Sequence, residues 1–138
     1  MTALKILIVD DDPDVRSLYR LVLKQEGLEV IEAESGQEAL TKVRAENPAL
    51  ILLDIMMPEM DGYEVCRRLR ADPQTARVPV LMCSAKGTSD DRKTGMRVGA
   101  DDFVTKSAGP RVLVNRILSL LSDSLPISDG APLAATRI

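Results

Sequence analysis

The sequence predicts an α/β fold in which one doubly wound, five-stranded parallel sheet is flanked by five helices. Apolar stretches alternate five times with stretches whose apolar residues recur at helical spacing, the order that builds a parallel sheet covered on both faces. The apolar stretches are nearly continuous, as in strands buried on both sides. The chain has 138 residues, the length of a single domain, and contains no internal repeat.

The predicted strands are short apolar runs bounded by acids or turn residues. They comprise residues 4–9, 28–33, 49–53, 78–83 and 101–105. Pro79 lies near the start of the fourth run, which suits the beginning of a strand because proline donates no ladder hydrogen bond.

The helices fill the intervals between the strands, and most have a recognisable start. They are predicted after Pro13, after Ser35, over 62–71, over 89–98 and from Pro110. Asp12 is placed to cap the first helix, and Gly27 is placed to end it. Ser35 and Glu38 have the spacing of a capping box.

Two segments have weaker patterns. The helix predicted over 89–98 is polar and interrupted by Gly95, so it has few apolar anchors. After residue 122 the helical periodicity is lost, and proline and small residues become frequent. We therefore expect one domain over residues 1–122, followed by a disordered tail or linker over 123–138.

Composition excludes several classes of function. The net charge is −3 and no block of Lys and Arg occurs, which disfavours direct binding to nucleic acid or to an anionic membrane. The sequence contains no histidine, which excludes catalysis by histidine and metal ligation by histidine. Cys66 and Cys83 do not have the spacing of a known cysteine motif and are expected to be reduced thiols. The sequence shows no signal peptide and no membrane-spanning run, so the protein is expected to be cytoplasmic.

Polar residues stand where the predicted strands end. The first strand is followed by Asp10 and Asp11, the third by Asp54, the fourth by Ser84 and the fifth by Lys106. In a doubly wound sheet the carboxyl ends of the strands share one edge, and ligands bind there. The sequence therefore predicts one site that contains three carboxylates, a hydroxyl and an amine.

These residue types favour phosphoryl chemistry with a metal ion. Three neighbouring carboxylates repel one another unless a cation neutralises them, and a site with few protein oxygens suits Mg²⁺. A lysine opposite the cation favours a dianionic phosphoryl group between two positive charges. Asp54 is the expected nucleophile, because it stands alone at its strand end and carboxylates form aspartyl phosphates.

Each residue also has a simpler interpretation. The acids from Asp10 to Asp12 suit a helix N-terminus, which favours negative charge. Ser84 alone fits a turn, and Lys106 alone fits a solvated surface lysine. An EF-hand is excluded, because Val15 and Leu21 stand where that loop needs glycine and glutamate. The prediction of a site depends on all of these residues falling at strand ends.

From residue 4 to about 121 the chain resembles the response regulator receiver domains of two-component signalling, including the chemotaxis regulators. The segments that carry the resemblance are "ILIVDDD", "LILLDIMMPEMDGYEV", "VPVLMCSAKG" and "GADDFVTK". The resemblance implies the flavodoxin-like strand order 2-1-3-4-5, which is also found in the chemotaxis members of the family. It also implies that Asp54 accepts phosphate from a histidine kinase or a phosphotransfer protein.

Roles for the remaining residues follow from the same resemblance. Asp11 and Asp54 would bind Mg²⁺ directly together with the backbone carbonyl of Met56, and Asp10 would bind it mainly through water. Ser84 and Lys106 would contact the phosphoryl group, and Ser84 would move toward it. Phe103 matches the aromatic switch position, and Met56 and Lys86 match positions that tune access of water to the phosphate.

The chain departs from the family after Lys106. Ser107 replaces the usual proline, whose cis bond aims the lysine, so a trans bond and a less well placed Lys106 are expected. Ala108 replaces the aromatic residue of the family, and Phe103 lacks a tyrosine hydroxyl. These departures predict altered coupling between phosphorylation and output.

Three functions remain open. The first is a switch in which phosphorylation moves Ser84 and the helix 89–98, and so changes partner binding on the face formed by that helix, the fifth strand and the last helix. The second is a receiver-like interaction module with impaired switching. The third, a magnesium phosphohydrolase, ranks last because Met56 replaces the second acid of the haloacid-dehalogenase type. No enzyme beyond self-catalysed phosphotransfer and slow autodephosphorylation is therefore expected.

Overall fold

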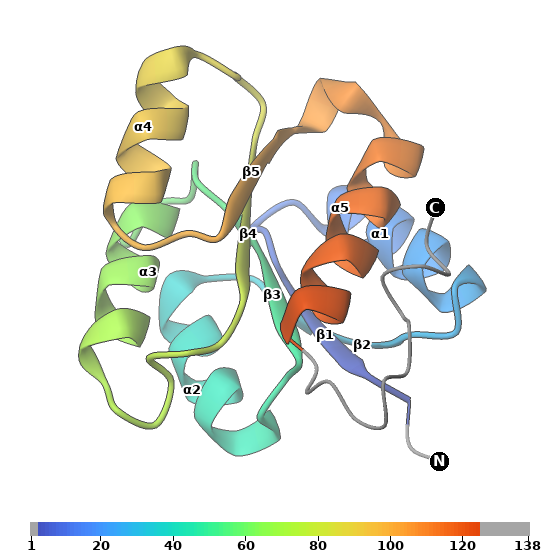
Figure 1. The fold of residues 1–138 in the computed structure, drawn as a ribbon, viewed down its shortest axis with the longest axis horizontal. Coiled ribbons are helices and arrows are strands. Elements are labelled where there is room, and N and C mark those ends of the chain that lie inside the picture. Colours follow the sequence, from blue (N-terminus) through green and yellow to red (C-terminus); the bar gives the residue numbers. More distant parts are fainter. Residues whose placement is uncertain (1–2, 125–138) are drawn as a thin grey trace.

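The computed structural model describes residues 3–124 and confirms the predicted fold class and strand order (Figure 1). One sheet contains five parallel strands in the order β2-β1-β3-β4-β5. The strands are β1 (Lys5–Val9), β2 (Glu29–Ala33), β3 (Leu50–Asp54), β4 (Val80–Ser84) and β5 (Asp102–Thr105). The helices are α1 (Pro13–Gln25), α2 (Gly36–Glu46), α3 (Gly62–Ala71), α4 (Ser89–Arg97) and α5 (Pro110–Ser124), and a short 3-10 helix (Lys106–Ala108) precedes α5.

Strand side chains alternate between two layers of core, as the twofold period of a strand requires. Leu7 and Leu53 pack on the side of α2 and α3, whereas Ile8 and Leu52 pack on the side of α1 and α5. Figure 1 shows α1 and α5 on one face of the sheet and α2, α3 and α4 on the other. The sheet is therefore buried on both faces, which explains the continuous apolar runs.

The predicted helix starts are present. The Asp12 carboxylate accepts a hydrogen bond from the Asp14 N–H at 2.9 Å. The Ser35 hydroxyl accepts from the Glu38 N–H at 3.1 Å, and the Glu38 carboxylate accepts from the Glu34 N–H at 2.7 Å. These caps satisfy N–H groups that have no partner inside the helix.

All five strands begin one or two residues later than predicted, and hydrogen bonding explains two of these shifts. The predicted strand 78–83 is observed as Val80–Ser84, because Pro79 lacks an N–H and joins the sheet only through its carbonyl, which accepts from Ile51 at 2.9 Å. The predicted strand 101–105 begins at Asp102: the Asp101 N–H donates to the Val80 carbonyl at 2.9 Å, but the Val80 N–H bonds to the Asp101 carboxylate at 2.8 Å and not to a backbone carbonyl.

Other boundaries move by one or two residues. The strands predicted over 28–33 and 49–53 are Glu29–Ala33 and Leu50–Asp54, so the third strand ends on the carboxylate itself. The 3-10 helix Lys106–Ala108 was not predicted. The last helix continues to Ser124, two residues past the predicted boundary at 122. Residues 125–138 of the predicted tail lie outside the described residues.

Helix α4 rests closely on the sheet through a glycine. Gly95 is the buried residue of this helix, and a Cβ atom there would lie 2.9 Å from Met82 Sδ and 3.5 Å from a ring carbon of Phe103. The glycine that weakens the helical pattern therefore permits close approach to β4 and β5. Helix α4 buries no large side chain, in contrast to α3, which buries Val65 and Leu69.

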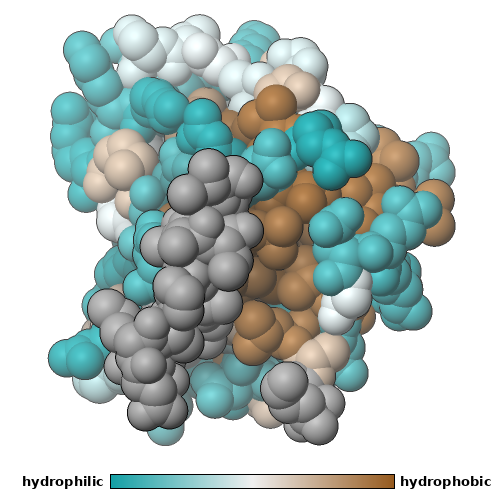
Figure 2. Space-filling view, turned by 45° about the vertical axis from the view of Figure 1, so that its right-hand side comes forward, coloured by the Kyte–Doolittle hydropathy of each residue, from teal (hydrophilic) through white to brown (hydrophobic). Residues whose placement is uncertain are grey.

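Apolar atoms also reach the surface on the side formed by α1 and α5. Figure 2 shows apolar atoms gathered there, on the side that lies at the right of Figure 1. The large apolar side chains that α1 exposes are Leu18 and Leu21.

Candidate functional site

Strand ends bring four predicted site residues to one edge of the sheet. Asp10 follows β1, Asp54 ends β3, Ser84 ends β4 and Lys106 follows β5. The register pairs Asp54 with Cys83, next to Ser84, and pairs Ser84 with Thr105, next to Lys106. Parallel pairing therefore places side chains from distant parts of the sequence on one rim.

Three carboxylates form the negative part of this rim. One oxygen atom each from Asp10, Asp11 and Asp54 lies within 4.8 Å of the other two. Asp10 and Asp54 are 2% and 3% exposed, whereas Asp11 is exposed. One Asp10 oxygen accepts a hydrogen bond from the Asp12 N–H at 2.9 Å, which orients that carboxylate.

Lys106 supplies the opposing positive charge. Its Nζ atom lies 2.8 Å from Asp10 Oδ2, to which it donates a hydrogen bond, and 3.3 Å from Asp54 Oδ1. No cis peptide bond occurs in the described residues, so the Lys106–Ser107 bond is trans as predicted. Lys106 begins the 3-10 helix, and its ammonium contacts both carboxylates. The expectation that Lys106 is less well placed toward a phosphoryl group stays a prediction.

Asp54 combines burial with an oxygen that is held only by an ion pair. Its Oδ1 atom is buried and accepts no well-formed hydrogen bond, and the Lys106 ammonium lies 3.3 Å away. Burial is the main cause that raises the pKa of Asp54 to about 6, and the Asp10 charge adds to it. The ammonium of Lys106 and the N–H of Met56 partly offset this rise in pKa. A carboxylate in this state favours an additional cation.

The β3–α3 loop folds tightly against the end of β3. The Gly62 N–H donates to the Ile55 carbonyl at 2.9 Å, and a Cβ atom at Gly62 would lie 2.4 Å from the Asp54 carbonyl oxygen. Only glycine permits this approach. The Met56 side chain is 65% exposed, so this residue faces the site through its backbone.

The remaining predicted residues lie on the β4 and β5 side. Ser84 is buried, and its hydroxyl accepts a hydrogen bond from the Lys86 N–H at 3.2 Å. The Lys86 side chain is exposed. Phe103 is 4% exposed and packs in the core against Gly95 of α4. Phe103 therefore contacts the helix that was expected to move.

Sequence reasoning missed two side chains near the site that hydrogen-bond to the backbone of neighbouring segments. Arg16 donates to the Asp10 backbone carbonyl at 2.7 Å and pairs with Glu32 at 2.9 Å. The Tyr63 hydroxyl, at the start of α3, donates to the Asp91 carbonyl of α4 at 3.3 Å. Arg16 lies one helical turn after the acidic run, but nothing in the sequence indicates that its guanidinium turns back toward Asp10.

The sequence also predicted reduced cysteines and no membrane-spanning segment. Cys66 and Cys83 are both buried and unpaired. Burial raises the pKa of the Cys83 thiol to about 11, which keeps it protonated. Among residues 3–124, no helix has the length and apolar character needed to cross a bilayer.

Comparison with known proteins agrees with this geometry. Residues 6–118 match the family described as "Response regulator receiver domain". The chain is 45% identical over 130 residues to the "Probable transcriptional regulator ycf27" of Pyropia yezoensis, which covers 93% of this chain and 52% of that protein. It is 41% identical over 133 residues to the "Phosphate regulon transcriptional regulatory protein PhoB" of Pseudomonas aeruginosa, which covers 96% of this chain and 58% of that protein. The chain thus spans little more than half the length of these relatives.

A solved structure shows the same likeness. The crystal structure of a putative response regulator from Chloroflexus aurantiacus J-10-fl has a TM-score of 0.84 and 37% identity, and the match covers 88% of this chain and 99% of that one. With the matched residues 6–118 and the shared strand order, this chain belongs to the response regulator receiver domain family.

Proposed function

We propose that this receiver domain is a phosphoacceptor in a two-component phosphorelay and that Asp54 takes the phosphoryl group. The observation that carries the proposal is the state of Asp54. Its carboxylate is buried at a strand end, one oxygen lacks a hydrogen bond, and Lys106 lies 3.3 Å away. A buried carboxylate whose one oxygen is held only by an ion pair with a lysine suits a nucleophile better than a scaffold residue.

The residues of the rim fit Mg²⁺. Three carboxylates meet within 4.8 Å, and only one lysine lies among them in the described residues. In this proposal Asp11, Asp54 and the backbone carbonyl of Met56 hold the ion, and Asp10 holds it through water. The bound ion would supply positive charge for the oxygens of a phosphoryl group.

The chain's own residues carry out the transfer in this proposal. An Asp54 carboxylate oxygen attacks the phosphorus of a phosphohistidine on a histidine kinase or phosphotransfer protein. A phosphorus–oxygen bond forms, the phosphorus–nitrogen bond breaks, and the imidazole nitrogen keeps the electron pair. Lys106 and the Ser84 hydroxyl then contact the phosphoryl oxygens. The charge of about −1.5 to −2 that is added stays between these groups.

Phosphorylation would then change the face formed by α4, β5 and α5. Helix α4 buries Gly95 but no large side chain, so its position depends on few contacts. Movement of Ser84 toward the phosphoryl group would shift the β4–α4 loop and the space around Phe103. The result is a change in the populations of two arrangements, and the partner binds one of them more tightly.

A second function is favoured by Ser107 and Ala108, which replace the proline and aromatic residue of the family. In that case the chain is a receiver-like interaction module whose partner binding does not respond to phosphate. The curated relatives are named as transcriptional regulators, so an output partner or output domain that acts on transcription is one candidate. The cytoplasmic location, the lack of direct contact with nucleic acid or membrane, and the lack of enzymatic turnover stay predictions.

The test is the intact mass of the protein after incubation with acetyl phosphate, with and without Mg²⁺. We expect one phosphate on the wild type only when Mg²⁺ is present, and none on Asp54→Asn. Asp12→Asn is the matched control, because Asp12 belongs to the same acidic run but only caps α1. Equal labelling of Asp54→Asn, or no labelling of the wild type with Mg²⁺, would remove Asp54 as the acceptor and leave the interaction module.

A further inference from the structure

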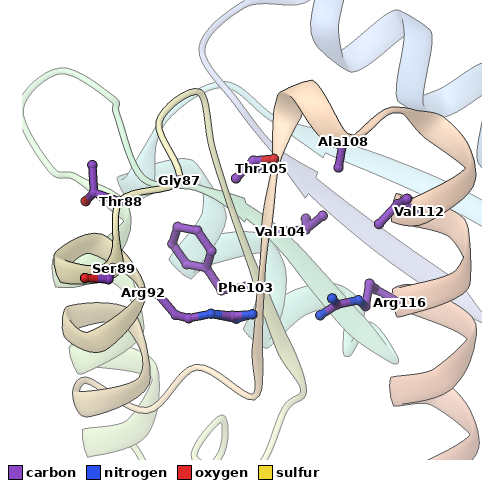
Figure 3. A pocket seen from close by; sticks show the side chains of 10 residues that line it. All are labelled: Gly87, Thr88, Ser89, Arg92, Phe103, Val104, Thr105, Ala108, Val112 and Arg116. Atoms are coloured by element: carbon purple, nitrogen blue, oxygen red, sulfur yellow. The ribbon is translucent and has the colours of Figure 1, made fainter.

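The two edges of the sheet are built differently. Beside the edge strand β5 lies a pocket of about 350 Å³, whose lining includes Phe103, Val112 and Arg116 (Figure 3). The opposite edge strand, β2, is covered by charged side chains that come from α1 and α2. Glu32 of β2 is the centre of these contacts, and its partner Arg16 also touches the acidic rim. The contacts of Glu32 therefore join this edge of the sheet to the proposed metal site.

We propose that Glu32 is a positioning residue for the acidic rim and that it acts through Arg16. The Glu32 carboxylate holds the Arg16 guanidinium against the backbone of Asp10 and keeps its charge away from the carboxylates that would bind Mg²⁺. The inference rests on the proposed function, because it concerns the metal ion that phosphorylation of Asp54 would use. It adds to that function a residue on a strand that supplies none of the proposed ligands.

Two hydrogen bonds fix the Arg16 guanidinium. Its Nε atom donates to Glu32 Oε1 at 2.9 Å, and its Nη1 atom donates to the Asp10 carbonyl at 2.7 Å. That carbonyl belongs to the peptide bond between Asp10 and Asp11, two of the proposed ligands. Only 13% of the Arg16 side chain is exposed, so water would replace the Glu32 carboxylate poorly. Without Glu32 the guanidinium would lose its counter-ion beside a peptide that carries two rim carboxylates.

The backbone of Glu32 is itself held by two neighbouring elements. It belongs to the β1–β2 ladder, which extends to a hydrogen bond from the Asp10 N–H to the Ala33 carbonyl at 3.1 Å. Its own carbonyl accepts a hydrogen bond from Lys42 of α2. Glu32 is therefore fixed relative to the strand that leads into the rim, and its carboxylate is held at a defined place.

The charges of the rim explain why Arg16 has to be restrained. Above pH 6 the three carboxylates and the ammonium of Lys106 carry a net charge of −2, which matches one divalent cation. The Asp11 carboxylate is exposed and forms no hydrogen bond or ion pair within residues 3–124. A second protein cation that paired with Asp11 would lower the attraction for Mg²⁺. Glu32 keeps Arg16 from becoming that cation.

A simpler interpretation is that these charges only shield an edge strand from pairing with another chain. Arg20 serves that purpose, because it donates to the Val30 carbonyl, which faces away from β1, at 3.5 Å. Lys42 does the same at the Glu32 carbonyl. Arg16 is directed to the rim and not to the outer edge of β2, so shielding does not account for it.

Isothermal titration of the full chain with Mg²⁺ at neutral pH tests the role of Glu32. Glu32→Met removes the carboxylate and should weaken binding of Mg²⁺ about tenfold. Glu29→Met is the matched control, because it removes the same charge from the other end of β2, where Glu29 pairs with Lys5 at 4.0 Å. Its effect should stay below about twofold. Equal weakening by both variants would overturn the proposal, since the effect would then be one of net charge.

A double variant shows whether Glu32 acts through Arg16. Two residues that act as one unit have effects that do not add, so Glu32→Met in the Arg16→Met background should change the affinity for Mg²⁺ less than about twofold. A combined loss of about a hundredfold would mean that the two residues act independently, and it would overturn the proposal. Glu32 and Glu29 are both partly exposed, and thermal midpoints of the variants show that they fold.

A second readout needs no metal ion. The ¹⁵N signal of the Arg16 Nε–H group is assigned by its loss in Arg16→Met. In the metal-free wild type this proton should exchange slowly with water, because Glu32 accepts it in a hydrogen bond. Exchange should be severalfold faster in Glu32→Met and unchanged in Glu29→Met. Unchanged exchange in Glu32→Met would show that Glu32 does not hold the guanidinium, which would overturn the proposal.

Labelling of the same samples with acetyl phosphate separates this inference from the proposed function. Mg²⁺-dependent labelling of the wild type, together with normal binding of Mg²⁺ by Glu32→Met, would reject only the role of Glu32. A wild type that neither binds Mg²⁺ nor accepts phosphate would reject the proposed function and this inference with it.

Discussion

The acidic rim and the α4–β5–α5 face are built in opposite ways. The rim holds buried carboxylates that are fixed by strand ends, by the Lys106 ion pairs and by the Arg16 contact with Asp10. The face contains α4, whose one buried residue is Gly95 and whose Met96 side chain is exposed. Under the proposed function, the fixed carboxylates of the rim would receive the phosphoryl group, and α4, which has few buried contacts, would change position in response.

Truncation of buried and exposed side chains should give the largest difference between the two regions, measured as loss of unfolding free energy. Leu53→Ala, next to Asp54 in the middle of the sheet, should lower the free energy of unfolding by about 3 to 4 kcal/mol, because a fully buried leucine leaves a cavity. Met96→Ala on α4 should cost less than about 0.5 kcal/mol, since that side chain is exposed. Urea unfolding followed by circular dichroism measures both values, and similar losses would contradict the comparison.

Asp54→Asn should stabilise the metal-free protein at neutral pH. Burial raises the pKa of Asp54 from 3.8 to about 6, so the folded protein holds this proton more tightly than the unfolded chain. Stability is then lost as the pH rises from 4 to 6, and the loss of about 2 to 3 kcal/mol persists above pH 6. Asparagine is uncharged over this pH range, so the Asp54→Asn variant does not lose this stability.

Thermal unfolding in EDTA tests this pH dependence. The advantage of Asp54→Asn should be near zero at pH 3.5, grow between pH 4 and 6 and stay constant above that. Mg²⁺ should reduce the advantage by stabilising the wild type. An advantage that is largest at pH 3.5 would show that burial of the Asp54 charge is not its cause.

Arg16→Met should weaken binding of Mg²⁺ about tenfold, because Arg16 holds the Asp10 backbone from outside the proposed ligand set. Arg20→Met is the matched control: Arg20 pairs with the same Glu32 but contacts the Val30 carbonyl instead of Asp10. Its effect on Mg²⁺ affinity should stay below about twofold. Isothermal titration provides both affinities, and equal effects would assign Arg16 to general stability alone.

Tyr63→Phe should have a small effect on stability and act only on α4. The Tyr63 hydroxyl joins α3 to the Asp91 carbonyl, and loss of this partly exposed bond should cost less than about 1 kcal/mol. Amide hydrogen exchange of residues 89–97 should nevertheless accelerate severalfold, while exchange in β1 and β3 stays unchanged. Uniform acceleration would mean that α4 does not open separately.

The fold was predictable because its signals are local or periodic. Apolar runs, the Ser35–Glu38 capping box and the acids at strand ends specify elements that parallel pairing then brings together. The exact strand starts depend on long-range bonds, such as the Asp101 carboxylate to the Val80 N–H, which no local pattern shows.

The sequence predicted the residue types of the site, but it did not predict the contacts that position them. Lys106 reaches the carboxylates through a 3-10 helix that the sequence did not indicate. The contact between Arg16 and Asp10 needs a side chain to fold back over a helix start, and the position of α4 depends on its contacts with β5 and on the close approach of Gly95 to Met82. These features are set by tertiary geometry.

The most direct test of coupling between the two regions is the ¹⁵N amide spectrum of the full chain with Mg²⁺ and beryllium fluoride, a mimic of the phosphoryl group. We predict shifts both at the rim, residues 10–12 and 54–57, and across residues 84–108, and Asp54→Asn should show neither set. Shifts confined to the rim would contradict the account, because the site would then bind its ligand without any change in the face.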